Sequence, residues 1–62
     1  MSDRLIALRN RSGLTPDSIA DRLSITAANY HRYETGERRP TMEILARLAC
    51  VLGVSMDELM EP

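Results

Sequence analysis

Apolar residues recur at helical spacing in several short segments of this chain, and no segment alternates apolar and polar residues as a half-buried strand does. In the first segment, Leu5 and Leu8 lie three positions apart, as two residues on one face of a helix do. Ser2 or Asp3 can cap this helix by accepting a backbone hydrogen bond. The pattern therefore predicts a helix over residues 3–12.

The next two predicted helices are separated by only three residues. They cover residues 16–23 and 27–34. Thr15 and Thr26 stand directly before them, where a threonine can cap a helix, and Pro16 suits a first helical position. Two short helices joined by so tight a turn form a helix-turn-helix, a unit that can present its second helix to the DNA major groove.

Two further helices are predicted in the C-terminal part. Thr41 precedes a helix over residues 42–52, and Ser55 with Glu58 is a capping box for a last short helix. Glycines that suit left-handed helix ends follow three of the predicted helices, at Gly13, Gly36 and Gly53. The apolar positions expected to face a shared core are Leu5, Leu8, Ile19, Ala20, Leu23, Met42, Leu45, Leu48, Ala49, Leu52 and Leu59.

Five helices without a repeat or a linker predict one compact all-α domain over residues 1–62. Its core is modest because the chain contains no phenylalanine or tryptophan. Burial of such a core offsets the chain entropy with little margin, so self-association would add useful stability.

Composition narrows the class of protein. No apolar run approaches the ~18 residues of a membrane span, and the N-terminus lacks the apolar segment of a signal peptide. Cys50 is the only cysteine, which excludes an internal disulfide and agrees with a reducing compartment. We therefore expect a cytoplasmic protein that does not contact membranes.

The charge is unevenly distributed, although its net value is only −1. Residues 1–39 carry seven arginines against five acidic residues, a net +2, whereas residues 40–62 carry one arginine against four, a net −3. All eight basic residues are arginine, which can form forked contacts to phosphate or guanine. This distribution gives mild support to nucleic-acid binding by the N-terminal part.

The inventory of reactive side chains argues against an enzyme. His31 and Cys50 are the only histidine and cysteine. No set of nucleophile, base and orienting group, no metal cluster and no glycine-rich phosphate loop can be assembled from them. We expect no catalysis, metal, cofactor or small-molecule substrate.

The chain resembles the phage-repressor and Cro type of helix-turn-helix regulator, the XRE family, from Leu5 to Leu59. The residues that carry the resemblance are L-x-x-L-R at 5–9, G-L-T at 13–15, I-A at 19–20, L-x-I-T at 23–26, Y-E-x-G at 33–36, R-R-P at 38–40 and L-x-x-L-A-x-x-L-G-V-S-x-x-E-L at 45–59. The resemblance implies a transcriptional regulator, or more narrowly a repressor, that binds double-stranded DNA as a homodimer on a two-fold site.

The resemblance also implies roles for particular residues. Arg9 and Glu34 correspond to an inter-helix salt bridge, and Tyr30 and Tyr33 correspond to buried positions. The residues implied to contact DNA are Thr15, Thr26, Ala27, Ala28, Asn29, His31, Arg32, Arg38 and Arg39. Thr15 would contact phosphate, and the arginine pair would lie beside the backbone or minor groove. The groove-facing positions would be Ala27, Ala28, Asn29 and Arg32, with His31 at their edge.

The chain departs from the family pattern at several of these positions. Pro16 replaces a common glutamine, and Ser24 takes a turn position usually held by glycine. Ala27 and Ala28 cannot make the bidentate bonds that read bases, although alanine can contact a thymine methyl. Direct readout would rest mainly on Arg32, and the operator could be read largely by its shape.

These departures from the family pattern leave an alternative function open. The domain could be a protein-interaction module, antitoxin-like or adaptor-like, that retains the fold with weak or no specific DNA binding. Its acidic sequence pI of about 5.7 favours this alternative. Separately, Ile44 and Val51 lie off the core stripe of their helix and could form a dimer seam with Cys50, or could be scattered surface residues.

Overall fold

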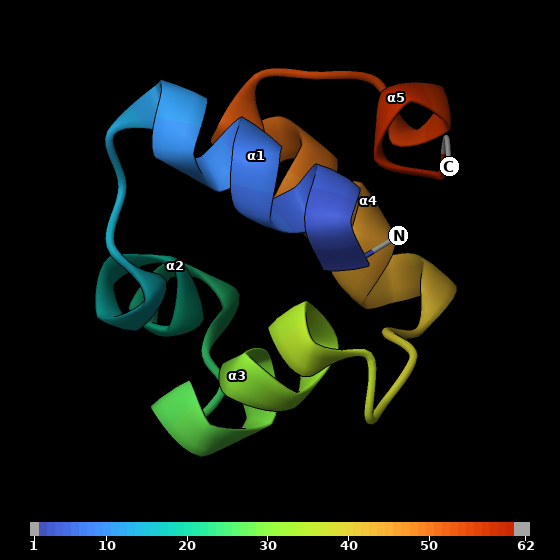
Figure 1. The fold of residues 1–62 in the computed structure, drawn as a ribbon. Coiled ribbons are helices and arrows are strands. Elements are labelled where there is room, and N and C mark those ends of the chain that lie inside the picture. The colour runs from blue at the N-terminus through green and yellow to red at the C-terminus, as the bar shows by residue number, and fades with distance from the viewer. Residues whose placement is uncertain (1, 61–62) are drawn as a thin grey trace.

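Five helices follow one another in the computed structural model of the chain, which describes residues 2–60 (Figure 1). They are α1 (Ser2–Ser12), α2 (Pro16–Leu23), α3 (Ala27–Thr35), α4 (Met42–Leu52) and α5 (Met56–Met60). The all-α fold class predicted from the spacing of apolar residues is confirmed, and α2, α4 and the start of α3 agree with the predicted bounds. None of the helices in the described part is long and apolar enough to cross a membrane.

The predicted helix starts and ends are formed by the expected groups. The Ile44 N–H donates to Thr41 Oγ1 at 3.2 Å, and the Glu58 N–H donates to Ser55 Oγ at 3.1 Å. The glycine after α1, the one after α3 and the one after α4 all adopt positive φ, at 74°, 83° and 70°. Local capping chemistry therefore sets most of the element boundaries.

Two boundaries differ from the prediction by one residue. Because α1 begins at Ser2, Asp3 lies in the first helical turn and not at the cap. The side chain of Ser2, the other predicted cap, lies outside the described part of the structure. At the other boundary, α3 continues through Thr35 before Gly36 ends it.

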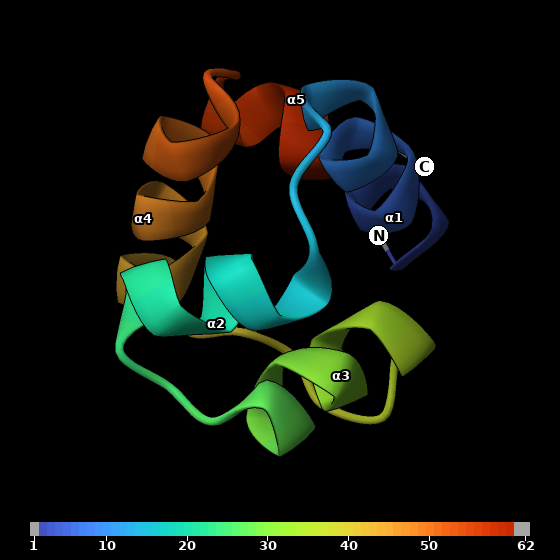
Figure 2. The same ribbon diagram turned by 90° about the vertical axis from the view of Figure 1, so that its left-hand side faces the viewer.

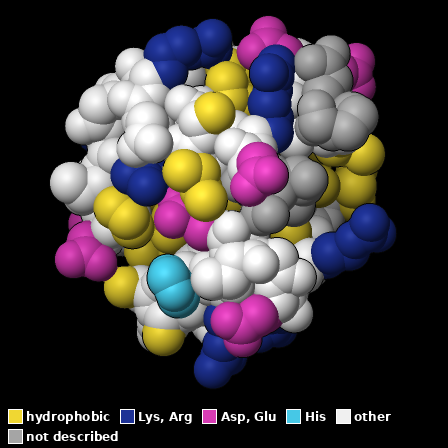
Figure 3. Space-filling view, viewed as in Figure 1, with side chains coloured by type: hydrophobic (Ala, Val, Ile, Leu, Met, Phe, Trp, Pro, Cys, Tyr) yellow, Lys and Arg dark blue, Asp and Glu magenta, His cyan; other side chains and the backbone are white. Residues whose placement is uncertain are grey.

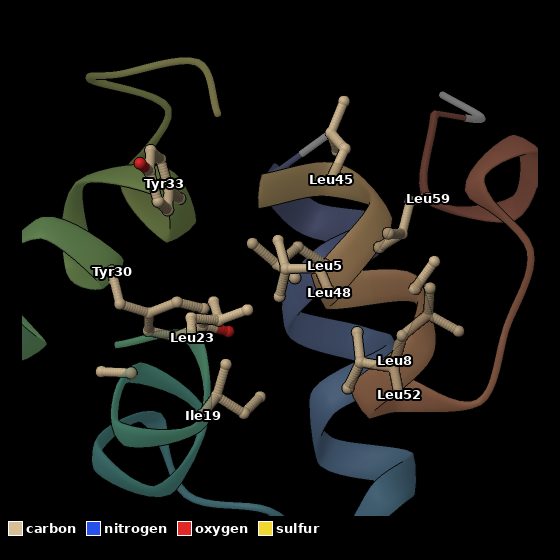
Figure 4. Close-up of a cluster of buried hydrophobic side chains, with 12 residues drawn as sticks. Leu5, Leu8, Ile19, Leu23, Tyr30, Tyr33, Leu45, Leu48, Leu52 and Leu59 are labelled. Atoms are coloured by element: carbon tan, nitrogen blue, oxygen red, sulfur yellow. The ribbon is translucent and has the colours of Figure 1, made fainter. Parts of the chain in front are cut away.

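The core joins side chains from all five helices (Figure 4). Its buried apolar members are Leu5, Leu8, Ile19, Ala20, Leu23, Tyr30, Tyr33, Leu45, Leu48, Ala49, Leu52 and Leu59. The Tyr30 ring extends from α3 into the middle of this cluster and is fully buried. Both tyrosines thus occupy the buried positions that the family resemblance implied.

One predicted core residue is wrong. Met42 was placed on the apolar stripe of α4, but its side chain is 65% exposed. It is the first residue of that helix, one turn before the buried Leu45. Ile44 and Val51, by contrast, are half-buried and pack against the core, although they lie off its stripe. Pro40, in the loop before α4, is buried, which the sequence pattern did not predict.

The helices divide into two groups in space. Figures 1 and 2 both place α2 and α3 at one end of the molecule and α5 towards the other, next to α1 and α4. The α1 helix packs against α3, α4 and α5, and α2 packs against α3 and α4. An arginine of α1 strengthens the far end, because Arg4 Nε donates to the Glu58 carbonyl of α5 at 3.0 Å. In this arrangement of the helices, the outer side of α2 and α3 has no covering helix in the described part of the chain.

Candidate nucleic-acid interface

A tight turn with one strained residue joins α2 to α3. Ser24 adopts φ 58° and ψ 39°, the left-handed conformation, and its N–H is directed to the carbonyls of Ala20 and Asp21. The Ile25 N–H donates to the Ala20 carbonyl at 3.0 Å. These bonds satisfy the carbonyls at the end of α2 and redirect the chain within three residues. A serine therefore performs a role that glycine fills with less backbone strain.

Two threonines cap the two helices of this unit in the same way. The Ser18 N–H donates to Thr15 Oγ1 and the Asn29 N–H donates to Thr26 Oγ1, both at 3.1 Å. Both threonines are exposed. A threonine hydroxyl that accepts a hydrogen bond still carries a proton, which it can donate to a phosphate oxygen. Each cap thus offers an outward donor beside the positive end of a helix dipole.

The α3 helix has one buried face and one exposed face. Tyr30 and Tyr33 point into the core, whereas the predicted groove-facing residues Ala27, Ala28, His31 and Arg32 are exposed and Asn29 is half-buried. At 100° per residue, Ala28 and Arg32 lie on the side of the helix opposite the tyrosines. The structure therefore brings most of the predicted base-reading positions onto an outer surface that no helix of the described chain covers.

An arginine of α1 holds α3 and the start of α2 in place. Arg9 Nε lies 2.5 Å from Glu34 Oε2, and the two side chains are 14% and 9% exposed. Arg9 Nη1 also donates to the Leu14 carbonyl at 3.1 Å, directly before the capping Thr15. The implied salt bridge is confirmed. Because one guanidinium contacts both segments, it constrains α3 relative to the entry into α2.

Tyr30 is a third member of this arrangement, and sequence reasoning missed it. Its hydroxyl donates to Glu34 Oε2 at 2.8 Å, the same oxygen that Arg9 contacts. Burial, followed by the hydrogen bond and the negative charge of Glu34, raises the pKa of the Tyr30 phenol far above its ordinary value. The spacing of four residues between Tyr30 and Glu34 is the sequence signal that could have revealed the pair.

The loop after α3 returns to the end of that helix. The Arg38 N–H donates to the Arg32 carbonyl at 3.3 Å, which keeps Arg38 and its neighbour Arg39 close to α3. All three arginines are exposed. On the face shown in Figure 3, however, arginines are separated by acidic, hydrophobic and uncharged surface. The face shown in Figure 3 therefore carries no continuous basic patch.

The first turns of α2 and α3 differ in whether they contain an acidic residue. Asp17 lies in the first turn of α2, whereas α3 is the one helix among residues 2–60 with no acidic residue in its first turn. The partial positive charge at the start of α3 is thus left available to an approaching phosphate. The start of α2 is already partly neutralised, and Pro16 contributes no N–H there.

Other candidate chemistry is sparse in the described part. Cys50 is a free, exposed thiol on α4. Among residues 2–60, no three histidine, cysteine or acidic side chains come close enough together to hold a metal ion.

Comparison with known proteins agrees with this geometry. Residues 1–61 match a family described as a helix-turn-helix domain. The chain is 39% identical over 59 residues to the cryptic phage CTXphi transcriptional repressor RstR of Vibrio cholerae, covering 95% of this chain and 53% of that protein. It is 41% identical over 58 residues to the HTH-type transcriptional regulator AnsR of Bacillus subtilis, covering 94% of this chain and 50% of that protein.

A third relative, an SPbeta prophage-derived uncharacterized HTH-type transcriptional regulator named YonR, also from Bacillus subtilis, is 37% identical over 59 residues. That match covers 95% of this chain and 55% of YonR. The chain thus spans about half the length of the curated relatives it matches.

Proposed function

The chain belongs to the helix-turn-helix domain family, and from this we propose that it is a DNA-binding transcriptional regulator that inserts α3 into the major groove. Occlusion of RNA polymerase from an overlapping promoter would make it a repressor. Its ligand is double-stranded DNA, in agreement with the expected cytoplasmic location.

One observation carries this proposal. The side of α3 opposite Tyr30 and Tyr33 is exposed, and it presents Arg32 between the Thr26 cap and the arginines of the following loop. An exposed helix with a base-reading arginine and flanking phosphate donors is the arrangement that groove recognition requires. The names of the similar proteins, which include a repressor and several regulators, also support DNA binding over the protein-interaction alternative.

We further propose that the active form is a homodimer on a two-fold site. A single module of this size buries less surface than operator affinity usually requires, whereas two modules can place their α3 helices in successive major grooves about 34–36 Å apart. The operator would then consist of two related half-sites.

A salt series on duplex DNA tests the proposal. DNA selected from a random duplex pool should bind with an affinity that falls steeply as salt rises, because phosphate contacts release counterions. Arg32→Ala should relax the preference at one base position by about 1–3 kcal/mol. Absence of measurable binding at low salt would reject the function.

Arg47→Ala is the matched control for Arg32→Ala. Arg47 is also exposed, lies on α4, and pairs with Glu43 through Nη2 and Oε1 at 2.9 Å. Arg47→Ala changes the net charge by the same amount as Arg32→Ala, but it should leave the base preference intact. Equal losses of preference in both variants would show that Arg32 reads no base.

A further inference from the structure

The two exposed side chains in the first turn of α3 are small and apolar, and the polar Asn29 beside them is half-buried. Ala27 and Ala28 are both exposed, and Ala28 lies one turn before Arg32 on the same face. The oxygen of the preceding Thr26 is engaged in capping through the Asn29 N–H. A side chain that ends at a methyl group permits the helix to approach base edges closely, and it supplies no hydrogen bond.

The chemistry of the major groove limits what such a surface can prefer. Most groups on the base edges there are hydrogen-bond donors or acceptors, and the C5 methyl of thymine is the apolar exception. A methyl group placed against the O6 and N7 atoms of guanine would remove their water without replacing it, which is unfavourable. The same methyl group placed against thymine buries apolar surface on both sides.

We infer that Ala27 and Ala28 are specificity-determining residues that select thymine through its C5 methyl group, beside the base read by Arg32. This inference rests on the proposed function and specifies the DNA it takes: each half-site contains thymine at one or two adjacent steps facing the start of α3. The two alanines then distinguish thymine from the other bases, and their lack of hydrogen-bonding groups is not a loss of base recognition.

Single methyl groups can be removed from the DNA to test this. Each thymine of the selected duplex is replaced in turn by deoxyuridine, which keeps base pairing and lacks only the C5 methyl. Fluorescence anisotropy at constant salt should show a rise in Kd of about fourfold per contacted methyl, equivalent to about 0.8 kcal/mol, at one or two adjacent steps of each half-site. Other thymines should have no effect.

Variants of the protein assign the contact to the alanines. In the Ala28→Gly variant, removal of the thymine methyl at the base step that Ala28 contacts should no longer weaken binding. The ratio of the Kd for the deoxyuridine duplex to the Kd for the thymine duplex should therefore fall towards one at that step. Ala46→Gly, at an exposed position within α4, carries a similar helix penalty and should retain the full ratio. If Ala28→Gly does not fold, Ala28→Ser replaces it, since serine retains a side chain and loses the apolar end. Ala27→Gly tests the second position in the same manner.

The outcomes separate the inference from the proposed function. Failure to bind any duplex would overturn both. Specific binding that is insensitive to every deoxyuridine replacement would leave the regulator standing and overturn thymine selection, pointing to readout of DNA shape. Sensitivity that is unchanged in Ala27→Gly and in both Ala28 variants would also overturn the assignment to these residues.

Discussion

The hydroxyl of Tyr30 donates to Glu34 Oε2 at 2.8 Å, one helical turn away on the same helix. The same oxygen lies 2.5 Å from Arg9 Nε of α1. One carboxylate oxygen therefore accepts from a phenol and a guanidinium at the junction of α1 and α3. This shared acceptor links α1 to the last turns of α3.

Glu34→Ala should destabilise the domain strongly. Removal of the carboxylate leaves a poorly hydrated guanidinium and a buried phenol without their partner, and we expect a loss of about 3 kcal/mol. In a domain of this size that corresponds to a melting temperature lower by more than about 10 °C, measured by circular dichroism.

The exposed pair between Arg47 and Glu43 provides the control. Its side chains are 52% and 73% exposed, so Glu43→Ala should cost less than about 0.5 kcal/mol. Comparable shifts in the two variants would contradict a structural role for the bridge at Glu34.

Stability should fall with rising pH above about pH 10 because of Tyr30. Burial and Glu34 raise the pKa of its phenol in the folded state, whereas an unfolded tyrosine ionises near pH 10. Above pH 10 the folded state therefore retains a proton that the unfolded state has lost. The free energy of unfolding should decline by up to about 1.4 kcal/mol per pH unit.

Urea unfolding at successive pH values measures this decline. The chain contains no lysine, so no ammonium groups titrate in the same range and obscure it. Tyr30→Phe should reduce the alkaline slope, and Tyr33→Phe, which retains the Tyr30 phenol, should keep it. An unchanged slope in Tyr30→Phe would disprove this origin.

Ser24→Gly should stabilise the domain. Ser24 holds φ at 58° between α2 and α3, a conformation that costs a side-chain-bearing residue about 1 kcal/mol and that glycine adopts freely. Because glycine also loses more entropy on folding, the expected net gain is about 0.5 kcal/mol, or a melting temperature about 2–4 °C higher. Ser24→Val should instead lower it, and a stable valine variant would refute the strain.

Asp17→Asn should strengthen DNA binding. The Asp17 carboxylate is exposed in the first turn of α2, two residues after Thr15, where a DNA phosphate is expected. Neutralising it should raise affinity a few-fold at low salt, and the gain should diminish as salt screens the charge.

Asp57→Asn makes the same charge change at the start of α5. Figures 1 and 2 place that helix at the opposite end from α3, so the affinity of the Asp57→Asn variant for DNA should be nearly unchanged. If both variants gain equally, the effect is one of net charge and the phosphate is not near Asp17.

Interactions between residues close in the sequence were the ones that the sequence predicted best. Thr15, Thr26 and Thr41 cap their helices through bonds that span three residues, so the identity of a few neighbours predicts them. The family resemblance placed Ser24 at a turn position usually held by glycine, and the structure gives this residue a positive φ. The DNA-contacting residues remain predictions, because exposure shows that they are accessible and not what they bind.

Spacing, caps and glycines were enough to determine five helices, their order and most of their buried faces, because these depend on contacts within a helical turn. Packing between helices decided the rest. It left Met42 exposed and it buried Pro40. It also added the Tyr30 hydroxyl to the contact between Arg9 and Glu34, a pair 25 residues apart that the family resemblance implied and the helical spacing did not. Such relationships depend on which surfaces of distant segments meet, and only the folded chain brings those surfaces together.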